Sequence, residues 1–327
     1  MKKVCPGLGA AICVIILILT VSSWRNAKPE EPPAEPVNIS EEPQDITEDR
    51  PQNIPQEEDA EEEPEEEAEP QTMDEDWSSY FGGLTGAAVI YDSAENRYAV
   101  YNGELAGTRR SPCSTFKIIS SLIGLEQGII LPDDSVRTWS GEMFWNEDWN
   151  RDIGFEDAFR TSCVWYFREV IDEIGRETMQ KELEKLAYGN CDISDWKGEQ
   201  NTNNSNRALT GFWIESSLKI SPKEQTEVME RIFGENSTYS EETIEILKEV
   251  MRLPEEYGTD IPVYGKTGMG KTDGITVDAW FTGFAETSEE PVYFCVYLGQ
   301  SEERDATSAA ARDIAVQIIS DYCENSR

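Results

Sequence analysis

The sequence predicts an α+β domain in which strands from both ends of the folded region form one antiparallel sheet and the middle contributes helices that pack on it. Near the start, two apolar runs flank the polar stretch 92–96 and predict a β-hairpin: Ala87–Tyr91 and Arg97–Tyr101. Near the end, three more apolar runs predict strands: Val263–Thr267, Ala279–Ala285 and Pro291–Leu298. Between them the pattern from Ser114 to about Leu253 is mostly helical, and Ala306–Tyr322 predicts a closing helix.

The charge and proline content divide the 327 residues into three parts. Residues 1–27 combine Lys2 and Lys3 with the uncharged run Leu8–Val21, which predicts a signal peptide or an N-terminal membrane anchor and hence an exported protein, either secreted or on the outer face of the membrane. Residues 28–76 hold 21 acidic residues, two basic residues and nine of the 16 prolines, and so predict a disordered acidic linker. Residues 77–327 carry apolar runs throughout and predict one folded domain.

Composition excludes several classes of function. The net charge of −37 repels phosphate backbones and argues against nucleic acid as a partner. The chain has no histidine, which removes Ser-His-Asp triads, Cys-His dyads and HExxH zinc sites. Its seven cysteines form no CxxC pair, so neither a zinc site nor a thioredoxin-type site is expected. Acid–base chemistry must therefore use lysine, tyrosine, serine or carboxylate side chains.

The sharpest local pattern is the sequence Ser114-Thr115-Phe116-Lys117, which follows Pro112. Proline favours the first turn of a helix, and residues i and i+3 share a helix face, so Ser114 and Lys117 can touch. This is the S-x-x-K pattern of a serine nucleophile with a lysine base. The apolar neighbours of Lys117 predict a lowered pKa, which would let the neutral amine act as a base or form a carbamate with CO2. The alternative is a lysine that extends along an amphipathic helix to solvent.

Three other short patterns follow along the chain. Lys266-Thr267-Gly268 on a strand suits a substrate carboxylate, with Gly268 allowing close approach of a ligand and the Met269 amide facing a developing oxyanion. A strand-end lysine in a turn is the alternative. Two further triplets carry no meaning alone: Ser162-Cys163-Val164 and Tyr188-Gly189-Asn190. Cys113, Cys163 and Cys191 adjoin these patterns and are expected to be buried small apolar residues.

Taken in order, the four patterns resemble the motifs of class D (oxacillinase-type) serine β-lactamases. The flanking text agrees, since Phe212-Trp213-Ile214-Glu215 resembles that family's tryptophan loop and Trp280-Phe281-Thr282-Gly283 resembles its strand after the K-T-G motif. The resemblance spans about residues 80–320. It implies a serine β-lactamase or penicillin-binding transpeptidase-like fold.

The resemblance also implies residue roles. The catalytic residues would be Ser114 as nucleophile, Lys117 as a carbamylated general base, and Ser162 with Lys266 as the path of a proton to the lactam nitrogen. The substrate-binding residues would be Val164, Trp213, Thr267, Gly268 and Met269, with Tyr188 to Asn190 shaping the floor. Within that set, Trp213 would hydrogen-bond the carbamate and Thr267 would hold the substrate carboxylate. No metal or organic cofactor is implied beyond the CO2 or bicarbonate that carbamylates Lys117.

The role of Arg312 and the class of protein each have more than one interpretation. Many members hold the substrate carboxylate with an arginine on the last helix, and Arg312 lies in that region either as this anchor or as a solvated helix-face residue. The same domain also resembles the sensor domains of penicillin-responsive membrane receptors, which stay acylated. A full-length receptor of that kind would need several membrane spans and a HExxH protease, which this chain is not expected to contain. A peptidoglycan D,D-transpeptidase is another alternative, although Ser162-Cys163-Val164 lacks that group's asparagine. Membrane contact is expected only through the N-terminal segment, and the oligomeric state is left open.

Overall fold

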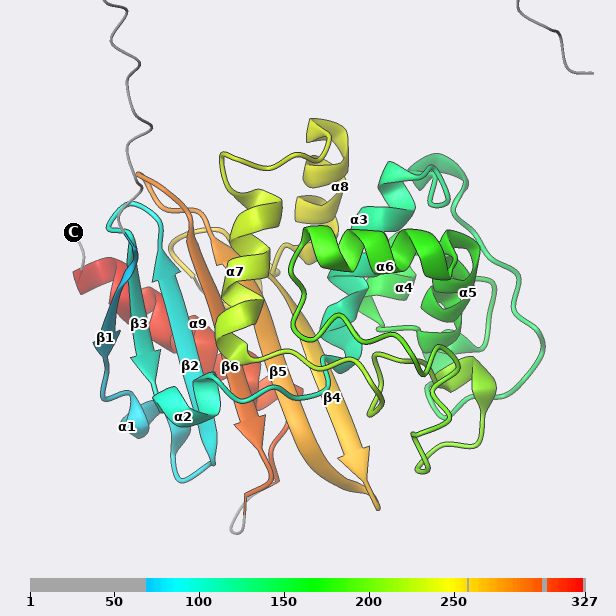
Figure 1. Ribbon diagram of the computed structural model, residues 1–327, viewed down its shortest axis with the longest axis horizontal. Helices are drawn as coiled ribbons and strands as arrows, with labels where there is room; N and C mark the ends of the chain where they lie inside the picture. Colours follow the sequence, from blue (N-terminus) through cyan, green and yellow to red (C-terminus); the bar gives the residue numbers. More distant parts are fainter. Residues whose placement is uncertain (1–68, 258, 302–304, 326–327) are drawn as a thin grey trace, which may run out of the picture. The chain divides into compact units, whose positions relative to one another are not determined.

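The structure, a computed structural model, describes residues 69–257, 259–301 and 305–325. The predicted signal or anchor segment and the predicted linker up to residue 68 lie outside these residues. The described chain contains one six-stranded sheet in the order β1-β3-β2-β6-β5-β4 (Figure 1). Its strands are β1 (Gln71–Asp74), β2 (Gly86–Asp92), β3 (Arg97–Tyr101), β4 (Val263–Thr272), β5 (Ile275–Ala285) and β6 (Val292–Gly299). The predicted hairpin and the three predicted C-terminal strands are confirmed.

Strand β1 corrects two predictions. It pairs parallel with β3, whereas the other neighbouring strands pair antiparallel, so the sheet is mixed rather than purely antiparallel. It also lies inside residues 28–76, so the folded domain begins several residues before the expected boundary at residue 77. All four residues of β1 are exposed, and backbone hydrogen bonds such as Glu75 N to Val100 O (2.8 Å) hold its end in place. A strand held by backbone pairing alone leaves no apolar alternation in the sequence.

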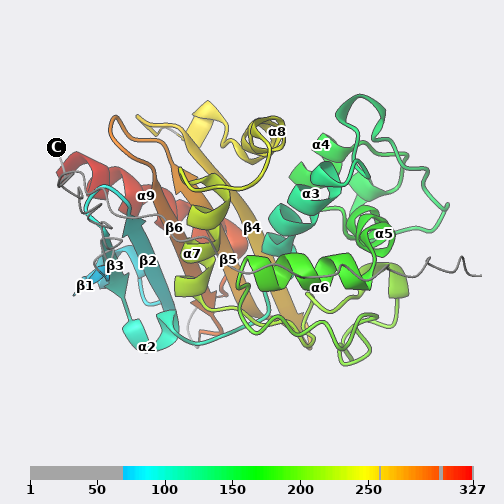
Figure 2. The same ribbon diagram turned by 45° about the horizontal axis from the view of Figure 1, so that its top comes forward.

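Helices cover both faces of the sheet and form a separate group beside β4. Helix α7 packs on one face, against β6 and β2, and α9 packs on the other, against β5 and β6 (Figure 2). Beside β4 lie α3, α4, α5, α6 and α8. The helix bounds are α1 (Ser78–Phe81), α2 (Gly103–Ala106), α3 (Lys117–Glu126), α4 (Phe155–Arg160), α5 (Val164–Ile174), α6 (Arg176–Lys185), α7 (Pro222–Phe233), α8 (Glu241–Met251) and α9 (Ser308–Asn325).

The middle of the chain is less helical than expected. Residues 127–154 and 186–221 contain only short 3-10 turns, and they are rich in Asn, Asp, Gly and Ser. These side chains bond neighbouring backbone amides and so compete with helix formation. Asn206, for example, accepts a hydrogen bond from the Ala208 amide and caps a 3-10 turn. Helix α7, in contrast, begins with a complete capping box formed by Ser221 and Glu224.

Two apolar cores meet near β4. The larger core fills the helical group and includes Phe116, Trp213 and Tyr264. The second lies between the sheet and α9 and includes Phe281 and Ile318. The predicted site residues lie at this boundary between the two cores.

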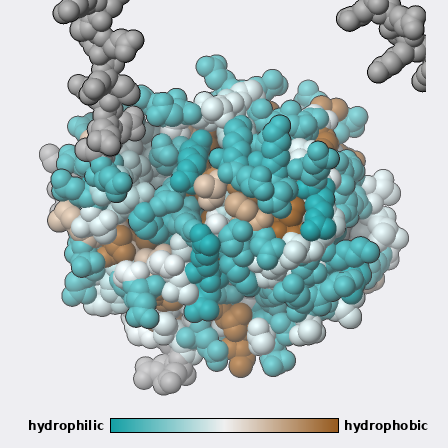
Figure 3. All heavy atoms as spheres, viewed as in Figure 1, coloured by the Kyte–Doolittle hydropathy of each residue, from teal (hydrophilic) through white to brown (hydrophobic). Residues whose placement is uncertain are grey.

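The surface of the domain is mainly polar. The face drawn in Figure 3 is covered mostly by hydrophilic residues, and its apolar residues form small separate patches. Within the described ranges, no helix is long and apolar enough to cross a bilayer.

Candidate active site

Ser114 and Lys117 lie together on a turn at the start of α3. Cys113–Phe116 form a 3-10 turn that continues directly into α3, and the Lys117 Nζ donates a hydrogen bond to the Ser114 Oγ at 3.1 Å. Cys113 just before the serine has a φ of +51°, in the left-handed region. Such a conformation is costly outside glycine and is typical of functional turns. The predicted contact between Ser114 and Lys117 is confirmed, although the turn is 3-10 rather than α-helical.

Burial sets the chemistry of Lys117. The side chain is 1% exposed, and its Nζ lies 5.4 Å from the centre of the Phe167 ring. Removal of the ammonium group from water lowers the pKa of Lys117 to about 8. The lysine that extends to solvent is therefore ruled out. The neutral amine, which a base or a CO2 acceptor requires, is therefore more populated near neutral pH than it is for an exposed lysine.

A second hydroxyl–lysine pair faces the same region. Ser162 lies in the turn between α4 and α5 with a φ of +57°, and its Oγ accepts a hydrogen bond of 2.5 Å from the Lys266 Nζ. Lys266 also donates to the Thr267 carbonyl at 3.3 Å. Burial, together with the neighbouring charge of Lys117, lowers the pKa of Lys266 to about 7. The two motifs are thus joined by contact across about 100 residues of sequence.

Gly268 makes a close contact that the sequence did not predict. The sequence suggested that it lets a ligand approach the backbone, but the neighbour in the structure is the nucleophile turn. A Cβ at Gly268 would lie 2.9 Å from the Pro112 carbonyl oxygen and 3.0 Å from the Thr115 Cγ2. The absence of a side chain therefore lets β4 pack directly against the turn that carries Ser114. Met269, the next residue, is partly exposed and lines a cavity with Ser114.

Two cavities are lined by residues of β4, one by residues before Gly268 and the other by residues after it. One, of about 600 Å³, is lined by Ser114, Val164 and Met269. The other, of about 1050 Å³, is lined by Lys266, Thr267 and Arg312. The two residues predicted to hold a substrate carboxylate thus share the second cavity. The Arg312 guanidinium lies 4.2 Å from the Tyr257 ring centre and bonds Asp313 at 2.8 Å.

Trp213 has a buried donor without a partner. Its side chain is 1% exposed, and within the described structure the indole Nε1 makes no hydrogen bond. Its ring packs on Phe116, one residue before Lys117, with centroids 6.0 Å apart, and its carbonyl accepts a hydrogen bond from the Cys113 amide. A buried donor left unsatisfied is costly. A polar acceptor placed beside it would remove this cost.

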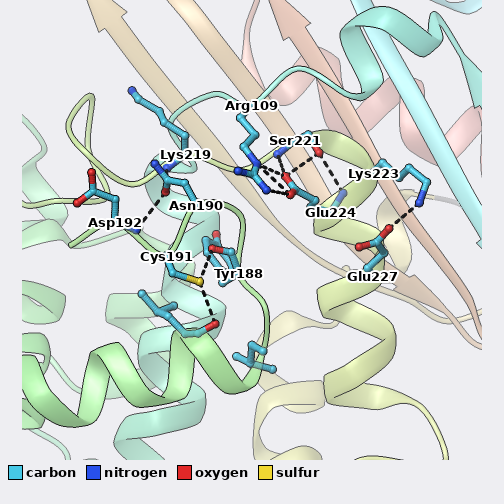
Figure 4. Close-up of polar contacts among 12 residues, drawn as sticks. Arg109, Tyr188, Asn190, Cys191, Asp192, Lys219, Ser221, Lys223, Glu224 and Glu227 are labelled. Atoms are coloured by element: carbon cyan, nitrogen blue, oxygen red, sulfur yellow. Dashed lines mark hydrogen bonds and ion pairs between the residues drawn. The ribbon is translucent and has the colours of Figure 1, made fainter. Parts of the chain in front are cut away.

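The third motif has a structural role (Figure 4). The Asn190 side chain donates to the Ser217 carbonyl at 2.9 Å and accepts from the Lys219 amide at 2.9 Å. A Cβ at Gly189 would lie 2.0 Å from the Lys219 carbonyl oxygen, so this position needs glycine. Tyr188 is buried and packs edge-on against Phe116 at 5.6 Å. Tyr188 thus packs against the nucleophile turn, while Gly189 and Asn190 contact residues 217–219.

The cysteines near the site are buried neutral thiols. Burial raises the pKa of the Cys113 thiol well above its usual range and that of Cys163 to about 11. Cys191 is half-buried, and its pKa is also raised by burial. A thiolate nucleophile is therefore not available at neutral pH.

Sequence reasoning missed a group of residues that line the smaller cavity. They come from two loops and are Trp145, Asn201, Thr202, Asn203, Asn204 and Glu215. The run of asparagines between residues 201 and 206 marks a loop in the sequence, but nothing there shows which surface it faces. Glu215 was noted only as part of the Phe212–Glu215 resemblance.

A buried Ser-x-x-Lys turn packed against a Lys-Thr-Gly strand at the junction of a sheet and a helical group defines an acyl-transfer serine site of the penicillin-binding type. Residues 84–320 match the penicillin binding protein transpeptidase domain, and the chain belongs to this family.

Relatives of two kinds share this domain. The chain is 32% identical to the regulatory protein BlaR1 of Bacillus licheniformis over 247 residues, which are 75% of this chain and 38% of that protein. It is also 32% identical to the probable β-lactamase YbxI of Bacillus subtilis over 243 residues, 74% of this chain and 82% of that one. The chain therefore spans well under half of BlaR1 but most of YbxI.

Solved structures give the same picture. The C-terminal domain of the Bacillus licheniformis BlaR penicillin receptor superposes with a TM-score of 0.67 at 29% identity, covering 77% of this chain and 97% of that one. A class D β-lactamase from Bacillus subtilis superposes with a TM-score of 0.64 at 32% identity, covering 75% and 94%. The predicted resemblance to class D β-lactamases and to penicillin-receptor sensor domains is confirmed, and so is the fold class.

Proposed function

We propose that this protein hydrolyses β-lactam antibiotics through an acyl-enzyme on Ser114, with Lys117 as the general base. The observation that carries the proposal is the buried Lys117 amine, whose pKa is lowered to about 8 and whose Nζ lies 3.1 Å from the Ser114 Oγ. A base must reach the proton that it removes and must have a pKa near the working pH. Lys117 meets both conditions.

Acylation would form the bond from the Ser114 Oγ to the lactam carbonyl carbon and break the lactam C–N bond. The serine proton would pass to the base on Lys117. The lactam nitrogen would receive a proton through Ser162 and Lys266, whose Oγ and Nζ atoms are 2.5 Å apart. The backbone amides of Ser114 and Met269 would stabilise the oxyanion. Thr267 and Arg312, which line the other cavity, would hold the substrate carboxylate.

Deacylation needs a base that can activate water beside the ester. The neutral Lys117 amine would add to CO2 and release one proton, giving a carbamate whose oxygens accept hydrogen bonds. The unpartnered Trp213 indole donor supports this assignment. The carbamate would accept a proton from the water that attacks the ester carbon, and the carbon–oxygen bond to Ser114 would break to release the ring-opened carboxylic acid. The carbamate would then return that proton to the Ser114 Oγ.

The second candidate is a penicillin sensor that is acylated and not hydrolysed. It is favoured by the similarity to BlaR1 and by the superposition on the BlaR receptor domain. A D,D-transpeptidase is less well supported, because the turn at Ser162 carries Cys163 and Val164 and no asparagine. For any of these functions we propose an exported chain that meets its substrate outside the membrane, since β-lactams act on the cell wall side.

The test is a time course with a chromogenic cephalosporin on the full chain at fixed concentrations of dissolved CO2. We expect continuous turnover that increases with CO2. At a given CO2 concentration the carbamylated fraction should rise with pH through about 8, because protonated Lys117 cannot add CO2. Lys117→Ala should lower turnover by about a hundredfold or more. Lys181→Ala, at an exposed position of α6, is the matched control, and this variant should turn over the substrate normally.

Two results of this time course would contradict the proposal. A burst of one product per enzyme, followed by no further reaction at any CO2 concentration, would favour the sensor. Normal turnover of Lys117→Ala would overturn the role of Lys117 as base.

A further inference from the structure

Glu215 joins three segments that surround the smaller cavity. Its carboxylate accepts one hydrogen bond from the Lys271 amide on β4, at 2.5 Å, and another from the Asn203 side-chain amide, at 2.8 Å. Its own backbone amide donates to the Ser111 Oγ at 2.8 Å, three residues before the nucleophile. One residue thus connects β4, the loop at Asn203 and the nucleophile turn.

The backbone of Glu215 has an unusual conformation. Its φ is +50°, in the left-handed region that a residue with a side chain rarely adopts. Such a conformation persists where the surrounding contacts hold it, and here they are the bonds to Ser111, Asn203 and Lys271.

The loop that Glu215 holds is also tied at both ends. Near its start, Asp195 accepts hydrogen bonds from the amides of Glu199 and Gln200, both at 2.8 Å. Near its end, the Asn206 side-chain amide donates to the Glu142 carboxylate at 2.6 Å, next to the segment that carries Trp145. The bond from Asn203 to Glu215 lies between these ties, where the loop borders the cavity.

The position of the loop indicates which part of a substrate it meets. Thr267 and Arg312 line the cavity whose β4 residues precede Gly268, so the carboxylate end of a β-lactam would lie there. The other end, with its acylamino substituent, would then enter the cavity lined by Asn203, Trp145 and Val164. The wall formed by the loop would limit the size of that substituent.

We propose that Glu215 is a positioning residue that holds the loop at Asn203 against β4 and so selects β-lactams by the size of their acylamino substituent. This inference rests on the proposed reaction of Ser114 with β-lactams. It requires only acylation and is independent of whether the acyl-enzyme is later hydrolysed.

The test exchanges the two groups of the hydrogen bond. Asn203→Asp places a carboxylate against Glu215 and should release the loop. The double variant Asn203→Asp with Glu215→Gln restores a bond with donor and acceptor reversed, while the new glutamine oxygen still accepts from the Lys271 amide. Asn236→Asp, on an exposed residue after α7, adds the same charge away from the cavity and is the control.

The readout is the acylation rate constant of the full chain for a penicillin with a small substituent and for an oxyimino cephalosporin with a large one. Both are measured by competition with a fluorescent penicillin. We expect Asn203→Asp to shift the ratio of the two constants toward the large substituent by about threefold or more. The double variant should return the ratio to that of the parent, and Asn236→Asp should leave it unchanged.

Three results would overturn the inference. An unchanged ratio in Asn203→Asp would do so, and so would a double variant that melts like the parent yet keeps the shifted ratio. Asn203→Ala, which only removes an exposed side chain, should show a smaller shift in the same direction, and no shift would count against the proposal. A chain that labels without turnover would refute hydrolysis alone, whereas one that no penicillin labels would refute both proposals.

Discussion

Lys117 and Lys266 lie side by side in a site where each is almost completely buried. Burial removes hydration from both ammonium groups and lowers the pKa of each amine, and the neighbouring charge of Lys117 lowers the pKa of Lys266 further. The hydrogen bonds to Ser114 and Ser162 give each amine a hydroxyl partner. Each lysine thus lies in hydrogen-bond contact with a hydroxyl group, in a chain that has no histidine.

Gly268 determines how closely β4 approaches the nucleophile turn, which leads to a prediction for a single added methyl group. In Gly268→Ala the Cβ would meet the Pro112 carbonyl oxygen at 2.9 Å, so β4 must move away. We expect a loss of about 1–3 kcal/mol in the free energy of unfolding and acylation slower by about tenfold or more. Chemical denaturation and labelling with a fluorescent penicillin measure the two effects.

Gly103→Ala is the matched control for this prediction. Gly103 lies in α2, and a Cβ there would have no atom within 4 Å. It should fold at least as stably as the parent and acylate normally. If Gly268→Ala behaved in the same way, the close packing of β4 on the turn would not matter for the reaction.

At this scale the sequence predicted local pairs better than distant ones. The contact of Ser114 with Lys117 follows from helix spacing, which the printed sequence shows directly. The contacts of Glu215 with Asn203 and Lys271 depend on a loop conformation that is held by long-range hydrogen bonds. Gly268 was placed at the site, but its neighbour could not be named without the fold.

Among the elements, β1 is held mainly through its backbone. Its four residues are exposed, and it pairs with β3 at the edge of the sheet opposite β4. Removal of β1 should therefore affect stability and leave the site intact. Strands β2 to β6, in contrast, carry apolar side chains that the sequence pattern revealed.

Two deletions test the role of β1. We expect a chain without residues 1–76 to lose about 1–2 kcal/mol in the free energy of unfolding relative to one without residues 1–68, because the pairing with β3 is lost. The acylation rate constants of both should equal that of the full chain. Thermal and chemical denaturation with penicillin labelling give the comparison. Equal stability of the two deletions would show that β1 contributes nothing, and slower acylation would link it to the site.

The sheet and the helical group form the site between them. Ser114 lies in the 3-10 turn that leads into α3, and Lys117 is the first residue of α3. Ser162 lies between α4 and α5, and Lys266 lies on β4. The order of strands and helices along the chain was sufficient to predict the α+β class, whereas the family resemblance came from the four motifs and their flanking residues. The long irregular segments that line the smaller cavity were predicted to be helical, and this prediction was wrong. Their asparagine- and aspartate-rich turns are stabilised by hydrogen bonds from side chains to the backbone, which leave no periodic pattern in the sequence.

The whole molecule carries a net charge of −37, and its proposed substrates are themselves anions. Long-range repulsion should therefore slow their approach, although Lys266 and Arg312 lie within the site. The Debye length falls from about 30 Å at 0.01 M salt to about 10 Å at 0.1 M, so added salt should screen the repulsion over most of the molecular surface.

We expect the acylation rate constant for an anionic penicillin to rise about two- to tenfold between 10 and 150 mM NaCl. A zwitterionic cephalosporin of similar size, which carries a quaternary ammonium group, has no net charge and should show little change. Removal of residues 1–68, which include most of the acidic tract, should reduce the salt effect for the penicillin without abolishing it. A rate constant that falls with salt for the penicillin would show that the local cations of the site, rather than the charge of the whole molecule, govern the encounter.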